Sequence, residues 1–208
     1  MNPPPPFTWK PVRFDFAAIA RFVAPGARVL DLGCGDGELL AYLREARGAE
    51  GYGVEIADEA VLGCARRGVA VVQMDLEAGL SIFEDQSFDY AILSQVLQRM
   101  KHVELVTREM TRVAKEAIVA FPNFGYWRHR LQVLRGRMPV SETLPEPWYA
   151  TPNVHLCTLL DFEEFCQKMG FMVFDSLVMH RGRVIRFLPN LRGSLAMIRF
   201  QAKRYGRP

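Results

Sequence analysis

The sequence predicts an α/β fold in which a mostly parallel sheet has helices on both faces. Short apolar runs alternate along the chain with segments whose apolar residues recur at helical spacing. The first of these runs, Val29–Leu32, breaks into the glycine-rich loop Gly33–Gly37 and restarts as a helix. A second apolar run ends in the acid Glu55. In sheets of this kind the ligand site lies at the carboxyl ends of the strands.

The N-terminus carries four consecutive prolines, Pro3 to Pro6, which favour an extended chain. We therefore assign residues 1–12 to a flexible, Pro-rich arm. Residues 13–208 are expected to form a single domain, because 208 residues suffice for one α/β core and not for two. Its first helix should run from Arg13 to Val23 and end at Pro25-Gly26.

The glycine-rich loop is the predicted ligand site. Glycines at 33, 35 and 37 remove Cβ atoms where the backbone must pass close to a ligand, and they permit positive φ. Asp31 places a carboxylate just before the loop, and Glu55 is placed to accept hydrogen bonds from ribose hydroxyls. The G-x-G-x-G spacing matches the pyrophosphate-binding fingerprint only in part.

The following segments continue the alternation of helix and strand. Asp58 can cap the next helix, and Gly68 can stop it. This helix should run from Asp58 to Arg67. The elements predicted after it are a strand at Val69–Met74 ending at Asp75, a strand at Phe88–Leu93, a helix at Val103–Val113 and a strand at Ala117–Phe121.

An insertion over residues 124–157 interrupts this pattern, with no regular periodicity from Phe124 to His155. Loops of this length are often functional, so a substrate lid, a partner-docking surface and a structural cap all remain open. His129 and His155 are expected to be polar surface or anchoring residues. The residues expected to contact a substrate or a partner are Tyr126, Trp127, Arg128, Trp148, Tyr149 and His155.

The C-terminal part should return to regular structure. Thr158 and Asp161 form a capping-box pattern that opens the last helix, which Gly170 ends. Strands are expected at Phe171–Val178 and, antiparallel, at Ser194–Phe200, followed by a frayed end. No acid follows Asp175, and we favour a solvated basic edge over a nucleic-acid or acidic-partner surface.

The composition is that of an ordinary globular protein, with a net charge of +3. Its four cysteines form no C-x-x-C pair and are expected to be reduced thiols, and no spacing predicts a metal site. No apolar run reaches the length of a membrane span and no signal pattern opens the chain, so we expect a cytoplasmic protein without membrane contact.

Three motifs resemble the S-adenosylmethionine-binding motifs of class I methyltransferases: residues 29–37, Glu55 and residues 71–75. The resemblance implies a Rossmann-like sheet of seven mostly parallel strands, with a lid-like insertion before the last helix. It also implies that the cofactor is S-adenosylmethionine or S-adenosylhomocysteine, with the glycine loop at its methionine part, Glu55 at the ribose and Asp75 near the adenine. The cofactor-binding residues are then Asp31, Gly33, Cys34, Gly35, Gly37, Glu55, Ile56, Asp75, Leu76 and Ser94.

No catalytic residue can be named from the sequence. Gln98 stands where many small-molecule methyltransferases have a histidine, and glutamine can hydrogen bond but cannot act as a base. Ser94-Gln95 and Pro122-Asn123 do not match the motifs of DNA methyltransferases, so nucleic acid is an unlikely partner.

The whole chain resembles the methionine biosynthesis protein MetW family, most specifically in residues 121–128, 137–139 and 148–155. That resemblance implies a role in methionine biosynthesis beside a homoserine O-acyltransferase, either an acetyl- or a succinyltransferase. Two hypotheses follow. The chain is a cofactor-binding partner protein of that enzyme, or it is a methyltransferase that acts on a small molecule.

Overall fold

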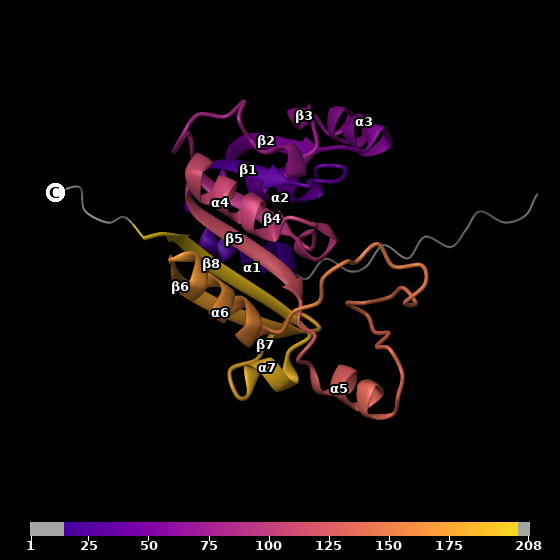
Figure 1. Ribbon diagram of the computed structural model, residues 1–208. Coiled ribbons are helices and arrows are strands. Elements are labelled where there is room, and N and C mark those ends of the chain that lie inside the picture. The colour runs from indigo at the N-terminus through magenta and orange to yellow at the C-terminus, as the bar shows by residue number, and fades with distance from the viewer. Residues whose placement is uncertain (1–14, 204–208) are drawn as a thin grey trace, which may run out of the picture.

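The computed structural model describes residues 15–203, so the predicted arm over residues 1–12, the start of the first helix at Arg13 and the end of the chain after Lys203 lie outside it. Within this range eight strands form one sheet in the order β3-β2-β1-β4-β5-β8-β6-β7 (Figure 1). The strands are β1 (Arg28–Leu32), β2 (Glu50–Glu55), β3 (Val71–Gln73), β4 (Phe88–Ser94), β5 (Ala114–Pro122), β6 (Phe171–His180), β7 (Arg183–Val184) and β8 (Leu195–Ala202). The helices are α1 (Asp15–Phe22), α2 (Glu38–Arg47), α3 (Asp58–Arg66), α4 (Val103–Val113), α5 (Trp127–Leu134), α6 (Leu159–Met169) and α7 (Pro189–Arg192), with short 3-10 turns η1 (Leu76–Ala78) and η2 (Leu97–Arg99).

The mostly parallel sheet agrees with the prediction, but the strand count differs by one. Strands β1 to β5 are parallel, and β8 inserts antiparallel between β5 and β6. The additional strand is β7, whose two residues pair with Met179 and His180 at the end of β6. A run of two residues has no periodicity that a sequence pattern can register, so β7 has no counterpart among the seven strands that the resemblance implied.

Helices cover both faces of the sheet and create two apolar cores. Side chains that alternate along one strand point to opposite faces, so Leu30 and Leu32 join one core while Val29 joins the other. Helices α4 and α6 pack on the first face, and α1, α2 and α3 pack on the second (Figure 1). Both cores run beneath the strand ends where the ligand site was predicted. Within residues 15–203, no helix combines the length and apolar character that crossing a bilayer requires.

The predicted caps have different outcomes. Thr158 and Asp161 form the capping box, with the Thr158 hydroxyl accepting from the Asp161 amide at 3.2 Å and the Asp161 carboxylate accepting from the Thr158 amide at 2.8 Å. Asp58 does not cap its helix, because Ala57 occupies the N-cap position. The Asp58 carboxylate instead accepts a hydrogen bond from Gln73 Nε2 at 2.5 Å.

The insertion is partly helical, contrary to the irregular chain that the sequence indicated. It contains α5, a helix of eight residues that is too short for its apolar spacing to stand out. Figure 1 shows α5 and the following chain projecting beyond the ends of β5 and β8. The insertion therefore extends the molecule on the side of the carboxyl ends of the parallel strands.

Asn123 fixes the base of the insertion to the sheet. Its fully buried side chain follows β5, donates from Nδ2 to the carbonyl oxygens of Asn190 (3.0 Å) and Gly193 (2.8 Å), and accepts at Oδ1 from the amides of Gly125 and Leu159, each at 3.1 Å. One side-chain amide group thus provides hydrogen-bond partners for two backbone carbonyls and two backbone amides. The side chain joins the end of β5 to the start of α6 and to the segment before β8.

We expect the Asn123→Leu substitution to lower the free energy of unfolding by at least about 3 kcal/mol, because it leaves several buried backbone groups without a partner. Urea denaturation followed by circular dichroism measures this change. Asn153→Leu is the matched control, since the Asn153 side chain makes no hydrogen bond to residues 15–203, and a change within about 0.5 kcal/mol is expected. Equal losses in the two variants would contradict the role assigned to Asn123.

Candidate functional site

The glycine loop makes a close turn at the end of β1. The amides of Gly33 and Cys34 both donate to the Val54 carbonyl, at 2.8 and 3.1 Å, which holds the loop against β2. Gly33 has a φ of 68°, and a Cβ atom there would lie 2.7 Å from Cγ2 of Val96. A side chain at this position would be strained both by its backbone conformation and by contact. The turn brings the loop backbone to the surface of a cavity.

Glu55 organises the same region from the end of β2. One of its carboxylate oxygens accepts from the Gly35 amide at 2.9 Å, and the other accepts from the amides of Ile56 and Ala57 at 2.8 and 3.0 Å. These bonds join the glycine loop to the start of α3. A carboxylate has about four acceptor positions, so one remains for a ligand hydroxyl.

Asp75 follows β3 and caps η1, because its Oδ1 accepts from the Glu77 amide at 2.9 Å. Glu77 in turn accepts from the amides of Lys101 and His102, at 2.5 and 2.8 Å. The Asp75 side chain is therefore held beside the cavity by its bond to the Glu77 amide, and the Glu77 side chain in turn attaches η1 to the start of α4.

The strand ends surround a cavity of about 410 Å³. It is lined by seven of the residues predicted to bind the cofactor: Gly33, Gly35, Glu55, Ile56, Asp75, Leu76 and Ser94. Asp31 and Cys34 line an adjoining small cavity of about 70 Å³, together with Gly33, Gly35 and Ser94. Gly37 lines neither of these cavities and lies at the N-cap of α2, against Val69 and Cys64.

Cys34 is a neutral thiol in this environment. Burial, together with the nearby Asp31 carboxylate, raises the pKa of Cys34 far above its usual range. Its sulfur lies 3.7 Å from that of Cys64, whose pKa is also raised by burial. All four cysteines are free, as predicted, and no cluster of three or more potential metal ligands occurs within residues 15–203. Since a thiol attacks only as the thiolate, Cys34 is a poor nucleophile.

The residues predicted to contact a substrate or partner do not form one site, and none of them lines the main cavity. Trp127, Trp148 and Tyr149 are exposed to 46, 71 and 75 %, respectively. Tyr126 is buried, and with Arg128 it lines a separate cavity of about 360 Å³. His155 lies at a third, open hollow between η1 and α4.

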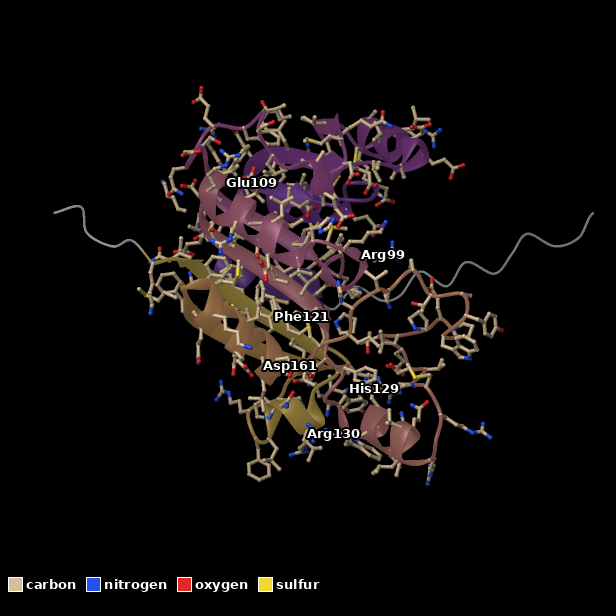
Figure 2. The ribbon with its side chains drawn as sticks, viewed as in Figure 1. Arg99, Glu109, Phe121, His129, Arg130 and Asp161 are labelled. Carbon is tan, nitrogen blue, oxygen red and sulfur yellow. The ribbon has the colours of Figure 1, made fainter. Side chains whose placement is uncertain are left out.

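His129 is a buried residue of α5 and not a surface residue, as Figure 2 shows by its place inside the fold of the insertion. Its Nε2 lies 2.8 Å from the Ser141 hydroxyl, and burial lowers the pKa of its imidazole. A neutral His129 therefore anchors one part of the insertion to another, which is the second of the two roles expected for it.

The outer wall of the main cavity was not predicted. It comprises residues from the turn after β4 and from the insertion: Gln95, Gln98, Arg99, Glu142, Thr143, Pro145, Glu146 and Asn153. The amides of Val154 and His155 donate to the Gln98 carbonyl at 2.8 and 3.0 Å, which brings the end of the insertion back to the strand ends. The acidic residues of the insertion were the sequence feature that could have indicated this wall. The prediction for the insertion rests on its aromatic and basic residues instead.

The fold is that of class I S-adenosylmethionine-dependent methyltransferases. A possible histamine N-methyltransferase from Thermotoga maritima aligns with a TM-score of 0.66 at 19 % identity, covering 92 % of this chain and 90 % of that one. A putative methyltransferase of Haloferax volcanii, solved in complex with the Trm112 methyltransferase activator, aligns with a TM-score of 0.67 at 16 % identity, covering 94 and 92 %. At these identities the likeness establishes the fold alone.

The sequence comparisons establish the family. The bifunctional methionine biosynthesis protein MetXA/MetW of Rhodopirellula baltica is 34 % identical over 200 residues, which cover 89 % of this chain and 32 % of the relative. This chain thus spans about a third of the length of that relative. The family model described as methionine biosynthesis protein MetW matches residues 13–200. The chain therefore belongs to the MetW family of methionine biosynthesis proteins.

Proposed function

We propose that this protein binds S-adenosylmethionine or S-adenosylhomocysteine and supports a homoserine O-acyltransferase in methionine biosynthesis. The observation that carries the cofactor assignment is the cavity at the carboxyl ends of β1 to β4, where Glu55, Asp75 and the glycine loop converge. Glu55 is assigned to the ribose, Asp75 to the adenine amino group and the Gly33–Gly37 loop to the methionine part.

Two observations support the partner assignment. The relative from Rhodopirellula baltica is a bifunctional MetXA/MetW protein, so the two components occur in one chain there. The insertion exposes Trp127, Trp148 and Tyr149 to solvent, and none of them lines the main cavity. Aromatic residues of this kind are enriched at the energetic centres of interfaces. A docking surface accounts for outward-facing aromatic side chains better than a substrate lid does. We therefore assign the partner contact to these three residues.

The alternative is a methyltransferase acting on a small molecule, and the part of the cavity lined by the insertion provides space for an acceptor. Methyl transfer needs an aligned nucleophile, and a base where that nucleophile carries a proton. Within residues 15–203 the cavity wall contains no histidine, lysine, cysteine or tyrosine, and Glu142 and Glu146 are the carboxylates on its outer side. We favour the partner role for this reason.

Calorimetric titration with S-adenosylhomocysteine tests the cofactor assignment. Glu55→Ala should weaken binding by about 10- to 100-fold, corresponding to roughly 1.5–3 kcal/mol for hydrogen bonds to a charged group. Glu59→Ala, on the exposed face of α3, should change the affinity less than about twofold. The absence of binding to the wild-type protein at millimolar ligand would remove the cofactor assignment.

Size-exclusion chromatography and titration with a homoserine O-acyltransferase test the partner assignment. Trp148→Ala should cost at least about 2 kcal/mol of binding if Trp148 is an anchor. The control is Phe187→Ala, which removes an aromatic side chain of similar exposure, 69 %, outside the insertion. Separate elution of the two wild-type proteins refutes the partnership. If the wild-type proteins co-elute and Trp148→Ala binds as tightly as Phe187→Ala, only the location of the contact is refuted.

Labelled methyl donor incubated with a cell metabolite extract tests the alternative function. Because no base stands at Gln98, we expect no saturable transfer of the label to a single metabolite. A double variant, Glu142→Gln with Glu146→Gln, identifies any turnover that depends on the outer wall. Robust turnover by the wild-type protein would establish the methyltransferase function in place of the partner role.

A further inference from the structure

The main cavity has an outer wall that the assigned cofactor contacts leave unused. The proposed contacts to adenine, ribose and methionine involve the strand ends and the glycine loop, whereas the outer wall is formed by η2 and the insertion. Three of its side chains, those of Gln98, Arg99 and Glu146, carry groups suited to a polar ligand. They are the basis of the inference that follows.

Gln98 presents a buried acceptor without a donor. Its Nε2 donates to the Gln95 carbonyl at 2.9 Å, and because a carbonyl can only accept, this bond fixes which end of the amide faces it. The opposite atom, Oε1, is buried and receives no hydrogen bond from any residue in the range 15–203. A buried acceptor left without a donor is costly, and Gln98 lines the main cavity, so a ligand there that offers a donor to this oxygen gains a hydrogen bond. The ligand group that meets it must be an N–H or O–H donor.

Two charges of opposite sign that form no ion pair within residues 15–203 lie in the same wall. Neither Arg99 nor Glu146 makes an ion pair with another residue in the described part of the chain, whereas Glu142 is paired with Arg181. Figure 2 shows Arg99 on the side of the strand ends that faces the insertion. A guanidinium group binds a carboxylate through two parallel hydrogen bonds, and a carboxylate such as that of Glu146 attracts an ammonium group. A ligand that satisfies both residues carries both charges.

We propose that the outer wall binds a small zwitterionic amino acid beside the cofactor. Arg99 holds its carboxylate, and its ammonium group donates to Gln98 Oε1 and lies near Glu146. A purely anionic ligand would leave Gln98 Oε1 without a donor, and a purely cationic one would gain no hydrogen bonds from the Arg99 guanidinium group. This inference rests on the proposed function for the position of the cofactor, and it adds a second ligand to the same cavity.

The test uses the full chain saturated with S-adenosylhomocysteine and three matched probes: L-2-aminobutyrate, propylamine and butyrate. Propylamine lacks the carboxylate of the first probe, and butyrate lacks its ammonium group. Saturation-transfer NMR titrations follow the methyl resonance of each probe. We expect 2-aminobutyrate to bind and each of the other two to bind about tenfold more weakly, or not at all, since each loses a charge-assisted hydrogen bond.

Variants assign the contacts. Arg99→Met and Glu146→Gln, both at exposed positions, should each weaken 2-aminobutyrate about tenfold and leave the affinity for S-adenosylhomocysteine within about twofold. Gln98→Met should do the same. Arg135→Met and Glu164→Gln are matched controls outside the cavity and should change neither affinity. The affinity for S-adenosylhomocysteine also reports whether each variant is folded.

The outcomes separate this inference from the function on which it rests. If S-adenosylhomocysteine binds but 2-aminobutyrate does not, or binds no better than butyrate and propylamine, the second ligand site is refuted. A tenfold loss of S-adenosylhomocysteine affinity in Arg99→Met and Gln98→Met refutes it too, because these residues then hold the amino-acid end of the cofactor. If S-adenosylhomocysteine fails to bind, the proposed function fails, and the same titrations on the ligand-free protein then support or refute the amino-acid site.

Discussion

The side chain of Asn123 is the interaction on which the arrangement of the carboxyl end of the sheet depends. Its four hydrogen bonds reach Gly125 in the insertion, Leu159 in α6, and Asn190 and Gly193 before β8. A buried amide with both ends satisfied fixes the directions in which three chain segments leave the sheet. The insertion can therefore be long without being free to change its point of attachment. Everything that it contributes to the cavity depends on this fixed base.

A second constraint acts on the strand-end side of the cavity. The Glu55 carboxylate accepts three backbone hydrogen bonds and is also the group assigned to the ribose. In this assignment, one carboxylate group both shapes the loop and recognises the ligand. Because the acceptor is already held in place by the backbone, little conformational entropy is lost when a hydroxyl group binds to it.

The sequence predicted the sheet and the strand-end half of the cavity because both follow from local patterns. Apolar runs mark the buried strands, and the residues directly after them, such as Glu55 and Asp75, must lie at one edge of a parallel sheet. The outer half could not be predicted in this way. Gln98 and Glu146 meet at the cavity only because the insertion returns to the strand ends, and no local periodicity encodes that return. The two-residue strand β7 and the short helix α5 were missed for lack of length.

The hydrogen bonds from Val154 and His155 to the Gln98 carbonyl have a consequence for which substitutions this segment tolerates. Because main-chain amides make the connection, almost any side chain is compatible with it, and proline is excluded because it lacks the N–H group. The exposed side chains of this segment can therefore be substituted without loss of these two hydrogen bonds, and the end of the insertion stays attached to the strand ends.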